Sequence, residues 1–289
     1  MNQVSDAKLA IACYNAGIVP SFFLSRFNNS NLTSKLDLIT SKNLSEFRKI
    51  VKESNLILSL SCLNLTVETI KLIIDYKVSH IELVDYFPST NSEKNEYRLY
   101  NKIINLLQKN GIKIILKLST ELGVGKYVTA DGVIIKSQNG AARIKYHGEN
   151  IKDLLLSTKR NHPNMPVIVS GGISTSKEIK EYLDAGAEAV SLGTVFALSE
   201  ESCINIQKKM SLVEMNYNNV TKIKVGNDEQ NAIVFSDVVD NDGNNTKGLR
   251  VGRDTADKGL IFIGKGIDNI NAIKPVSEIV KELTKDVQI

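Results

Sequence analysis

Seven short runs of apolar, mostly β-branched residues alternate with helical patterns over the first 200 residues of the chain. The runs occupy residues 18–24, 56–63, 80–86, 112–118, 131–137, 166–170 and 189–193. They are continuously apolar, so they predict strands that are buried on both faces, as in a parallel sheet covered by helices. Between them, apolar residues recur at the spacing of a helix, over residues 45–53, 66–76, 93–111 and 149–161.

Strand followed by helix, repeated along the chain, favours the α/β class and a TIM-type (β/α)8 barrel over residues 1–200. Seven strands are one fewer than a closed barrel needs, so either the first strand is missing or altered, or another segment fills its place. The link "ELGVGKYVTA" is short for a full crossover helix between two parallel strands.

After residue 200 the pattern changes to short β-type runs separated by Asn, Asp and Gly, and "DNDGNN" is the clearest turn signal. We interpret residues 201–289 as an appendage packed on the barrel. It ends in an amphipathic helix, whose apolar face comprises Val276, Ile279, Val280 and Leu283.

Composition narrows the class of protein further. The 289 residues are 42% hydrophobic, enough for a large core, and the net charge of +4 does not favour nucleic acid or a membrane surface. The three cysteines, Cys13, Cys62 and Cys203, are widely spaced and form no CxxC pair, so we expect neither a disulfide framework nor a metal site. No signal peptide or membrane-spanning run is evident, which predicts a cytoplasmic protein in a reducing compartment.

Two consecutive loops place glycine at the carboxyl end of a predicted strand. The first, in "VIVSGGISTSKEI", contains Gly171 and Gly172, and the second, in "SLGTVF", contains Gly193 and Thr194. Barrels of this class commonly bind phosphate at their last two loops, where backbone N–H groups converge near a helix N-terminus. These four residues are therefore predicted to bind phosphate; the alternative is that the glycines only form tight turns.

The helix after the double glycine has clear boundary signals. Thr175 and Glu178 have the spacing of a capping box, and Ile179, Tyr182 and Leu183 are predicted to face the core. Gly186 is predicted to end the helix.

Three further segments, together with the glycine loop, suggest a family. "KLAIACYNAGIVPSF", "SLGTVFALSEES" and "IFIGKGIDNINAIKPVSEIVKEL" resemble, in this order, the first helix and second strand, the eighth strand and the closing segment of the nitronate monooxygenase family, whose relatives include flavin-dependent enoyl-thioester reductases. The resemblance implies a TIM barrel that binds FMN, with the phosphate on Gly171, Gly172, Gly193 and Thr194. It also implies oxidation of alkyl nitronates with oxygen, or reduction of enoyl thioesters with NAD(P)H.

Two segments depart from the family pattern. Members begin with a strand that contains an Ala-Pro-Met-Ala-type turn, and no counterpart precedes the first helix here. Members also have a Gly-Gly-His segment whose histidine acts on the substrate, where this chain has Ala141, Ala142 and Arg143. The guanidinium pKa lies above about 12, so Arg143 cannot serve as a general base, although it could hold an anionic group. His147 could replace the histidine if the loop folds back; otherwise it is a solvent-facing loop residue.

Other polar residues lie at predicted strand ends, where a flavin ring would lie. Lys117 could approach the pyrimidine edge of the ring, where a cation stabilises reduced flavin, and Asn64 could form a hydrogen bond with the ring. Glu82 and Asp85 are acidic residues in an otherwise buried strand.

Three functions remain open. The first is an FMN-dependent oxidoreductase with a small-molecule substrate, and the second is a catalytically silent relative that binds a phosphate ligand or a protein partner, for example in a biosynthetic assembly. The third is a phosphosubstrate enzyme without flavin, for which Glu82, Asp85 and Lys117 are the available acid–base residues. A homo-oligomer is compatible with each of these functions.

Overall fold

The computed structural model describes residues 5–24, 33–53, 55–61, 65–84, 102–118, 130–144, 150–225, 228–235 and 259–287. The chain divides into two compact units, Met1–Ile134 and Ile135–Ile289. Strand β5 (Gly132–Lys136) crosses the boundary between them. The prediction of an appendage over 201–289 stays a prediction.

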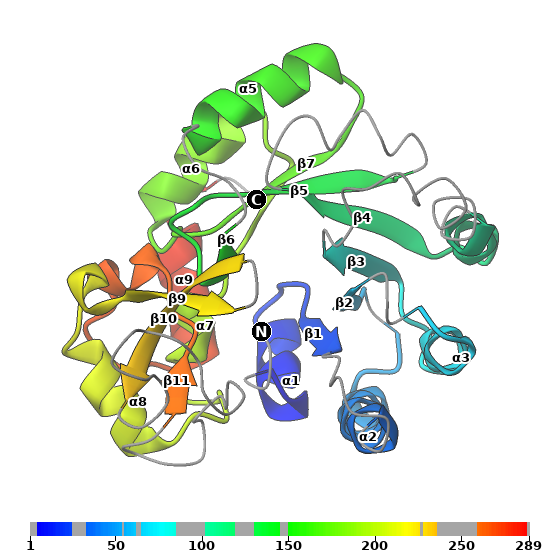
Figure 1. Ribbon diagram of the computed structural model, residues 1–289, viewed down its shortest axis with the longest axis horizontal. Helices are drawn as coiled ribbons and strands as arrows, with labels where there is room; N and C mark the ends of the chain where they lie inside the picture. Colours follow the sequence, from blue (N-terminus) through cyan, green and yellow to red (C-terminus); the bar gives the residue numbers. More distant parts are fainter. Residues whose placement is uncertain are drawn as a thin grey trace. The chain divides into compact units, whose positions relative to one another are not determined.

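The first unit alternates helices and parallel strands, as the sequence predicts. Its elements are α1 (Ala7–Asn15), β1 (Ser21–Leu24), α2 (Thr33–Ile50), β2 (Ile57–Ser61), α3 (Val67–Asp75), β3 (His80–Val84) and β4 (Lys113–Leu118), with residues 102–109 helical as well. Figure 1 shows α2 and α3 on one side of these strands. One face of the sheet is fully apolar, with Leu58, Leu60, Ile81, Leu83, Ile114 and Leu116 each at most 2% exposed.

The second unit contains the remaining helices. They are α5 (Ile151–Asn161), α6 (Ser176–Asp184), α7 (Thr194–Ala197), α8 (Ile206–Val213) and α9 (Val276–Thr284), with the 3-10 turns η3 (Tyr217–Asn219) and η4 (Lys265–Asn269). The parallel strands β7 (Val167–Ser170) and β8 (Ala189–Ser191) lie next to each other.

All seven predicted strands are present, in the order β1-β2-β3-β4-β5-β7-β8. Strands β1 to β4 pair in parallel with their neighbours, as do β7 and β8; His80 lies opposite Lys113, for example, and Ile168 opposite Ala189. A parallel sheet with helices between its strands belongs to the TIM-barrel class, as predicted.

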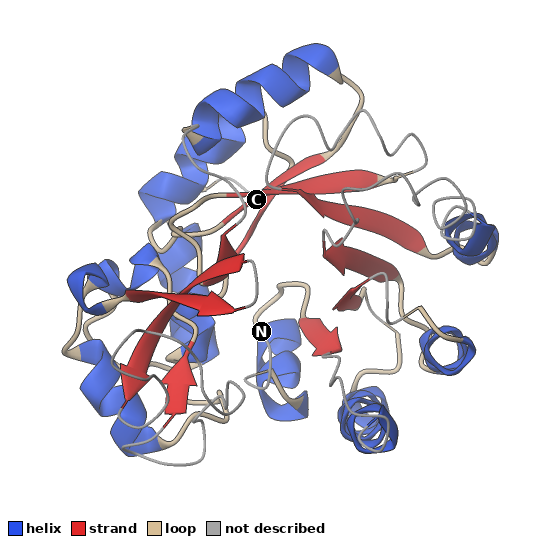
Figure 2. Cartoon of the chain, viewed as in Figure 1, coloured by secondary structure: helices blue, strands red, loops and turns tan. Residues whose placement is uncertain are grey.

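A second, antiparallel sheet lies within the second unit (Figure 2). Strand β10 (Asp228–Phe235) pairs with β9 (Thr221–Val225), β11 (Gly259–Ile261) and β6 (Ala142–Ile144). The β-type runs after residue 200 predict β9 to β11 in outline, whereas β6 is not predicted. The "DNDGNN" turn lies outside the described residues.

The boundary signals of the last helices are confirmed. Thr175 and Glu178 form a reciprocal capping box at the start of α6, and Gly186 follows the helix with φ of +98°. In α6, Ile179 is buried whereas Tyr182 and Leu183 are only half-buried. In α9 the residues Val276, Val280 and Leu283 are buried, as predicted, and Ile279 is half-buried.

Three glycines allow the backbone of three loops in the second unit to approach closely. A Cβ on Gly140 would lie 3.0 Å from the Cα of Gly171, and one on Gly171 would lie 3.1 Å from the Cα of Gly140. A Cβ on Gly264 would lie 2.7 Å from both the amide nitrogen of Ala141 and the carbonyl oxygen of Asn139. The loops after β5, β7 and β11 therefore pack backbone against backbone.

We predict that Gly264→Ala destabilises the chain more than Gly266→Ala. Gly264 has φ of −110°, which any residue adopts. Glycine is therefore required only because a Cβ at this position would have no space. The expected loss in free energy of unfolding is about 1–3 kcal/mol, because backbone atoms must move. A Cβ on Gly266 would instead lie 3.2 Å from the Cβ of Ser174, a side-chain contact that can adjust. Urea unfolding of both variants is the measurement; equal midpoints would contradict the prediction.

Candidate phosphate-binding site

A cavity of about 370 Å³ in the second unit lies next to the double glycine. Its walls come from residues 137–139 after β5, residues 171–173 after β7, the start of α5, and Glu178, Tyr182 and Lys265. Most of these residues stand at or beyond the carboxyl end of a strand, which is the edge where barrels of this class place their ligands.

Gly171 and Gly172 form the turn that follows β7, and both have a positive φ. Their φ angles are +100° and +79°, a region that favours glycine. Within the described residues, neither backbone N–H has a hydrogen-bond partner. Successive backbone N–H groups in a turn can form a concave site for an anion, and the phosphate site expected at these two glycines stays a prediction.

The N-terminus of α6 is already occupied by a carboxylate of the chain itself. Oε2 of Glu178 accepts hydrogen bonds from the amides of Ser174 and Thr175, at 2.9 and 3.0 Å, and from the Thr175 hydroxyl at 2.9 Å. The helix N-terminus therefore cannot offer these two donors to a ligand, which limits the helix-terminus contribution predicted from the sequence. An anion in this cavity depends mainly on the glycine amides.

The second predicted loop lies at the start of α7. Gly193 has φ of −131°, so its conformation does not require glycine, and neither Gly193 nor Thr194 lines the 370 Å³ cavity. The buried hydroxyl of Thr194 accepts a hydrogen bond from the amide of Gly264 at 3.1 Å. Since a hydroxyl both accepts and donates, its hydrogen remains available for a ligand oxygen.

Two lysines near the loops are functional candidates that the sequence reasoning missed. Lys136, at the end of β5, donates to the carbonyl oxygen of Ala141 at 2.7 Å, and Lys265 lines the cavity. Both follow signals that were visible in the sequence: a cation at a strand end, and a cation between the glycines of the closing segment. Lys265 adds a positive charge to the wall of the cavity, which Glu178 also lines.

Burial affects a third ionisable group of the cavity wall. The pKa of Tyr182 lies above its usual value because the phenol is partly buried and because Glu178 and Glu181 add negative charge. Tyr182 is therefore neutral at physiological pH and can only donate or accept hydrogen bonds.

The predicted catalytic residues lie at or beyond the edge of the described chain. Arg143 belongs to β6, where its backbone lies opposite Gln230 of β10. His147, Asn64 and Asp85 lie outside the described residues. Ala142, one of the two alanines in the family's glycine positions, has φ of +59° and so retains the backbone conformation of a glycine.

Lys117 forms a buried ion pair in the first unit. Its ammonium lies 2.7 Å from Oε1 of Glu82, and the two side chains are 20% and 7% exposed. Burial alone would raise the pKa of Glu82, but the charge and hydrogen bond of Lys117, with a hydrogen bond from Ser59, hold it below its usual value. Glu82 is therefore an ionised counter-charge and unsuited to act as a proton donor.

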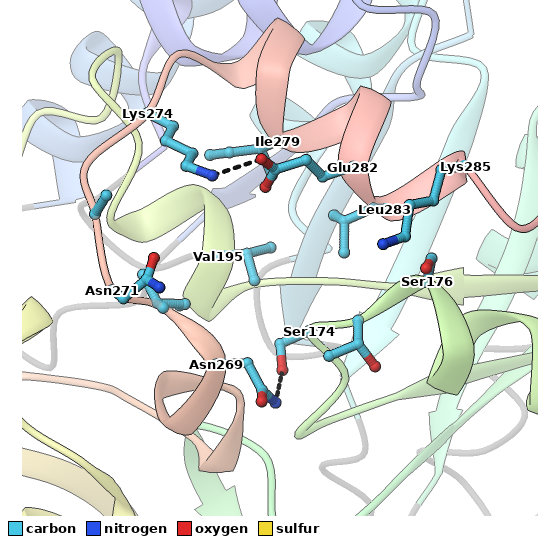
Figure 3. A pocket seen from close by; sticks show the side chains of 13 residues that line it. Ser174, Ser176, Val195, Asn269, Asn271, Lys274, Ile279, Glu282, Leu283 and Lys285 are labelled. Atoms are coloured by element: carbon cyan, nitrogen blue, oxygen red, sulfur yellow. Dashed lines mark hydrogen bonds and ion pairs between the residues drawn. The ribbon is translucent and has the colours of Figure 1, made fainter.

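A second cavity of about 300 Å³ lies within the second unit beside α9 (Figure 3). Four of its polar side chains pair with one another: Lys274 with Glu282 at 2.5 Å, and Asn269 with the hydroxyl of Ser174 at 2.9 Å. Paired groups offer a ligand less than the free glycine amides do, so the 370 Å³ cavity is the better candidate.

Neither a metal site nor a membrane-spanning helix is present in the described part of the chain. There, no three His, Cys, Asp or Glu side chains are placed to hold a metal ion. No helix in the same residues is long and apolar enough to cross a membrane.

Known proteins resemble this chain in sequence and in fold. The family model for nitronate monooxygenase matches residues 40–286. The structure of FabK from Thermotoga maritima aligns with a TM-score of 0.77 and 21% identity, over 99% of this chain and 90% of that one. A nitroalkane oxidase from Streptomyces ansochromogenes aligns with a TM-score of 0.73 and 15% identity, over 99% and 93%. At these identities the two structures support the fold alone.

One curated relative matches over a short segment. The catalytic subunit of dihydroorotate dehydrogenase B (NAD(+)) from Malacoplasma penetrans (strain HF-2) is 35% identical over 63 residues, which is 21% of each chain. The match thus spans about a fifth of that relative's length and does not define the activity of this chain.

We predict that Glu82→Gln abolishes the contribution of residue 82 to the pH dependence of stability, whereas Lys117→Met reverses its sign. Because the pKa of Glu82 is lowered by folding, its ionised form stabilises the fold above about pH 4.3, and this is lost as the pH falls. Lys117→Met leaves a buried carboxylate with a raised pKa, so stability is full below about pH 4.3 and falls as the pH rises.

Urea unfolding at several pH values tests this pair. Glu82→Gln should lose about 3 kcal/mol at neutral pH, because the ammonium of Lys117 is left without its counter-charge. The double variant, with both Glu82→Gln and Lys117→Met, shows how stability depends on pH through all the other titrating groups. Parallel pH profiles of Lys117→Met and the wild type would rule out the proposed coupling.

We further predict that Ala142→Gly stabilises the chain by about 1 kcal/mol, since it relieves an alanine held at positive φ. Ala141→Gly is the matched control: φ of Ala141 is not positive, so glycine there should cost about 0.5–1 kcal/mol. Thermal unfolding of the two variants provides the comparison. An unfolding midpoint of Ala142→Gly below that of the wild type would show that Ala142 is not strained.

Proposed function

Because the chain belongs to the nitronate monooxygenase family, we propose that it is a flavin-dependent oxidoreductase that binds FMN and acts on a small-molecule substrate. The proposal concerns three finer points: the identity of the flavin, the residues that hold its phosphate, and the class of substrate.

The loops of the second unit fit a phosphate group. Gly171 and Gly172 offer N–H groups without partners among the described residues, and a side chain at either position would meet the loop after β5 at 3.0–3.1 Å. The hydroxyl of Thr194 retains a hydrogen to donate. The observation that supports phosphate binding most strongly is that two successive glycines, at positions where a Cβ would be crowded, have N–H groups without partners among the described residues.

FMN suits these donors because it ends in a phosphate monoester, which carries a charge of about −1.5 to −2 at neutral pH. Within the cavity we assign the phosphate to Gly171 and Gly172, with Lys265 adding positive charge at the wall; Gly193 and Thr194, the other two residues predicted from the sequence, do not line this cavity. When bound, the flavin would supply the two-electron redox chemistry that amino-acid side chains lack. Ring contacts from Lys117 and Asn64 stay predictions.

For the substrate, we propose an alkyl nitronate in preference to an enoyl thioester. A nitronate is an anion, and Arg143, in the position of the family's histidine, carries a permanent positive charge that can bind one. Arg143 would then orient the substrate while another group, such as His147, handles protons.

A second candidate function follows from the same segment. Ala141, Ala142 and Arg143 replace the family's Gly-Gly-His, whereas Ala142 keeps a glycine-like φ of +59°. Such a loop is compatible with a catalytically silent relative that still binds a phosphate ligand. Oxygen uptake with an alkyl nitronate, or oxidation of NAD(P)H with an enoyl thioester, separates the two functions.

We predict that Gly171→Ala weakens FMN binding about tenfold or more, whereas Gly186→Ala leaves it unchanged. Both glycines have φ near +100°, so both variants carry similar backbone strain. A Cβ at position 171 would in addition meet the backbone of Gly140, whereas the nearest atom to one at position 186 is 3.9 Å away. Losing one hydrogen bond to a charged group costs about 1.5–3 kcal/mol, which sets the tenfold expectation.

Quenching of FMN fluorescence by the purified chain measures the Kd. The bound flavin should also give the protein a yellow absorbance. If the wild type takes up no FMN after reconstitution, the flavin proposal fails. If Gly171→Ala binds as well as Gly186→Ala, the assigned phosphate site is wrong.

A further inference from the structure

Asn231 of β10 is fully buried and bonded to the loop that faces Gly171. Its side-chain nitrogen donates to the carbonyl oxygens of Gln138 at 3.0 Å and Gly140 at 2.8 Å, and lies 3.2 Å from the hydroxyl of Tyr217. The residue is 0% exposed. One side chain of the second sheet thus binds two carbonyls of the loop after β5.

That loop forms one wall of the proposed phosphate site. The amide of Ser137 donates to the carbonyl oxygen of Ser170 at 2.8 Å, next to Gly171. Gly140 and Gly171 are so close that a Cβ on either would lie 3.0–3.1 Å from the Cα of the other. A shift of Gly140 therefore moves the position at which the amides of Gly171 and Gly172 can meet an anion.

The other end of the same side chain is unfavourable for stability. Oδ1 of Asn231 is buried and has no hydrogen-bond partner among the described residues. An unpaired buried acceptor costs about 1–3 kcal/mol, a cost that an apolar side chain at the same buried position would not carry. An apolar residue could not form the two hydrogen bonds that the amide of Asn231 donates to the loop.

We infer that Asn231 is a positioning residue: it holds the 137–141 loop against Gly171 and thereby sets the affinity of the glycine turn for a phosphate group. The inference rests on the proposed phosphate site. It links the antiparallel sheet of the second unit to ligand binding, through a residue that itself lies outside the cavity wall.

The experiment compares four variants of the full chain. Asn231→Leu removes the two donors, and Asn231→Asp places a carboxylate oxygen against the two carbonyls. Tyr217→Phe removes only the third partner of the amide. Lys209→Met is the control for stability, because its ammonium also bonds three backbone carbonyls, those of Ser199, Glu200 and Ser202, outside the 137–141 loop.

The readouts are the Kd for FMN, the Kd for inorganic phosphate, and hydrogen exchange of the 137–141 amides without ligand. We expect both Asn231 variants to weaken both ligands about tenfold or more and to speed exchange of the loop, with Asn231→Asp the weaker binder. Tyr217→Phe should change either Kd less than twofold. Lys209→Met should lose as much stability as Asn231→Leu but keep its affinity.

The outcomes separate this inference from the flavin proposal. If the wild type binds phosphate but not FMN, and Asn231→Leu loses phosphate, the flavin proposal fails and the role of Asn231 stands. If the wild type binds FMN, two results would refute the positioning role. One is that Asn231→Leu binds FMN as tightly as the wild type, and the other is that Asn231→Leu and Lys209→Met lose affinity for FMN to the same extent. A wild type that binds neither ligand refutes both.

Discussion

The close approach of three backbone segments is the constraint on which the second unit depends. The loops after β5, β7 and β11 approach so closely that a Cβ would be crowded at Gly140 and Gly171, at 3.0–3.1 Å, and would clash with backbone at Gly264, at 2.7 Å. The amide of Lys265 then donates to the carbonyl oxygen of Asn139 at 2.8 Å. Because these contacts are made by backbone, they fix the loops more rigidly than side-chain packing would. The turn at Gly171 and Gly172 owes its shape to them, and so does any anion site that it forms.

The sequence predicted what local patterns determine. Continuous apolar runs such as residues 166–170 became parallel strands, and the spacing of Thr175 and Glu178 became a capping box, since both patterns act over a few residues. Strand β6 was missed because β10, with which it pairs in the described part of the chain, lies more than 80 residues away, and three residues carry no periodicity of their own. The role of Asn231 was missed for the same reason: its partners, Gln138 and Gly140, are 93 and 91 residues distant.

One prediction combined two signals that compete for the same atoms. A capping box and an anion-binding helix N-terminus were both expected at α6, but Glu178 satisfies the amides of Ser174 and Thr175 itself. The carboxylate already complements the helix dipole, so a phosphate there would meet negative charge. Anion binding then falls to the preceding glycine turn, whose N–H groups Glu178 does not reach.

The backbone of residues 140–142 keeps a glycine-like conformation although the sequence of this segment differs from the family pattern. Ala142 keeps a positive φ that costs free energy, although the glycine that would tolerate it is absent. The contacts around it explain why the conformation persists: Lys136 bonds the carbonyl of Ala141, and Asn231 bonds that of Gly140. The loop is thus held by its neighbours and not by its own sequence. A substitution of the family's histidine by Arg143 can therefore alter the chemistry at this position while the backbone of the adjoining glycine turn is preserved.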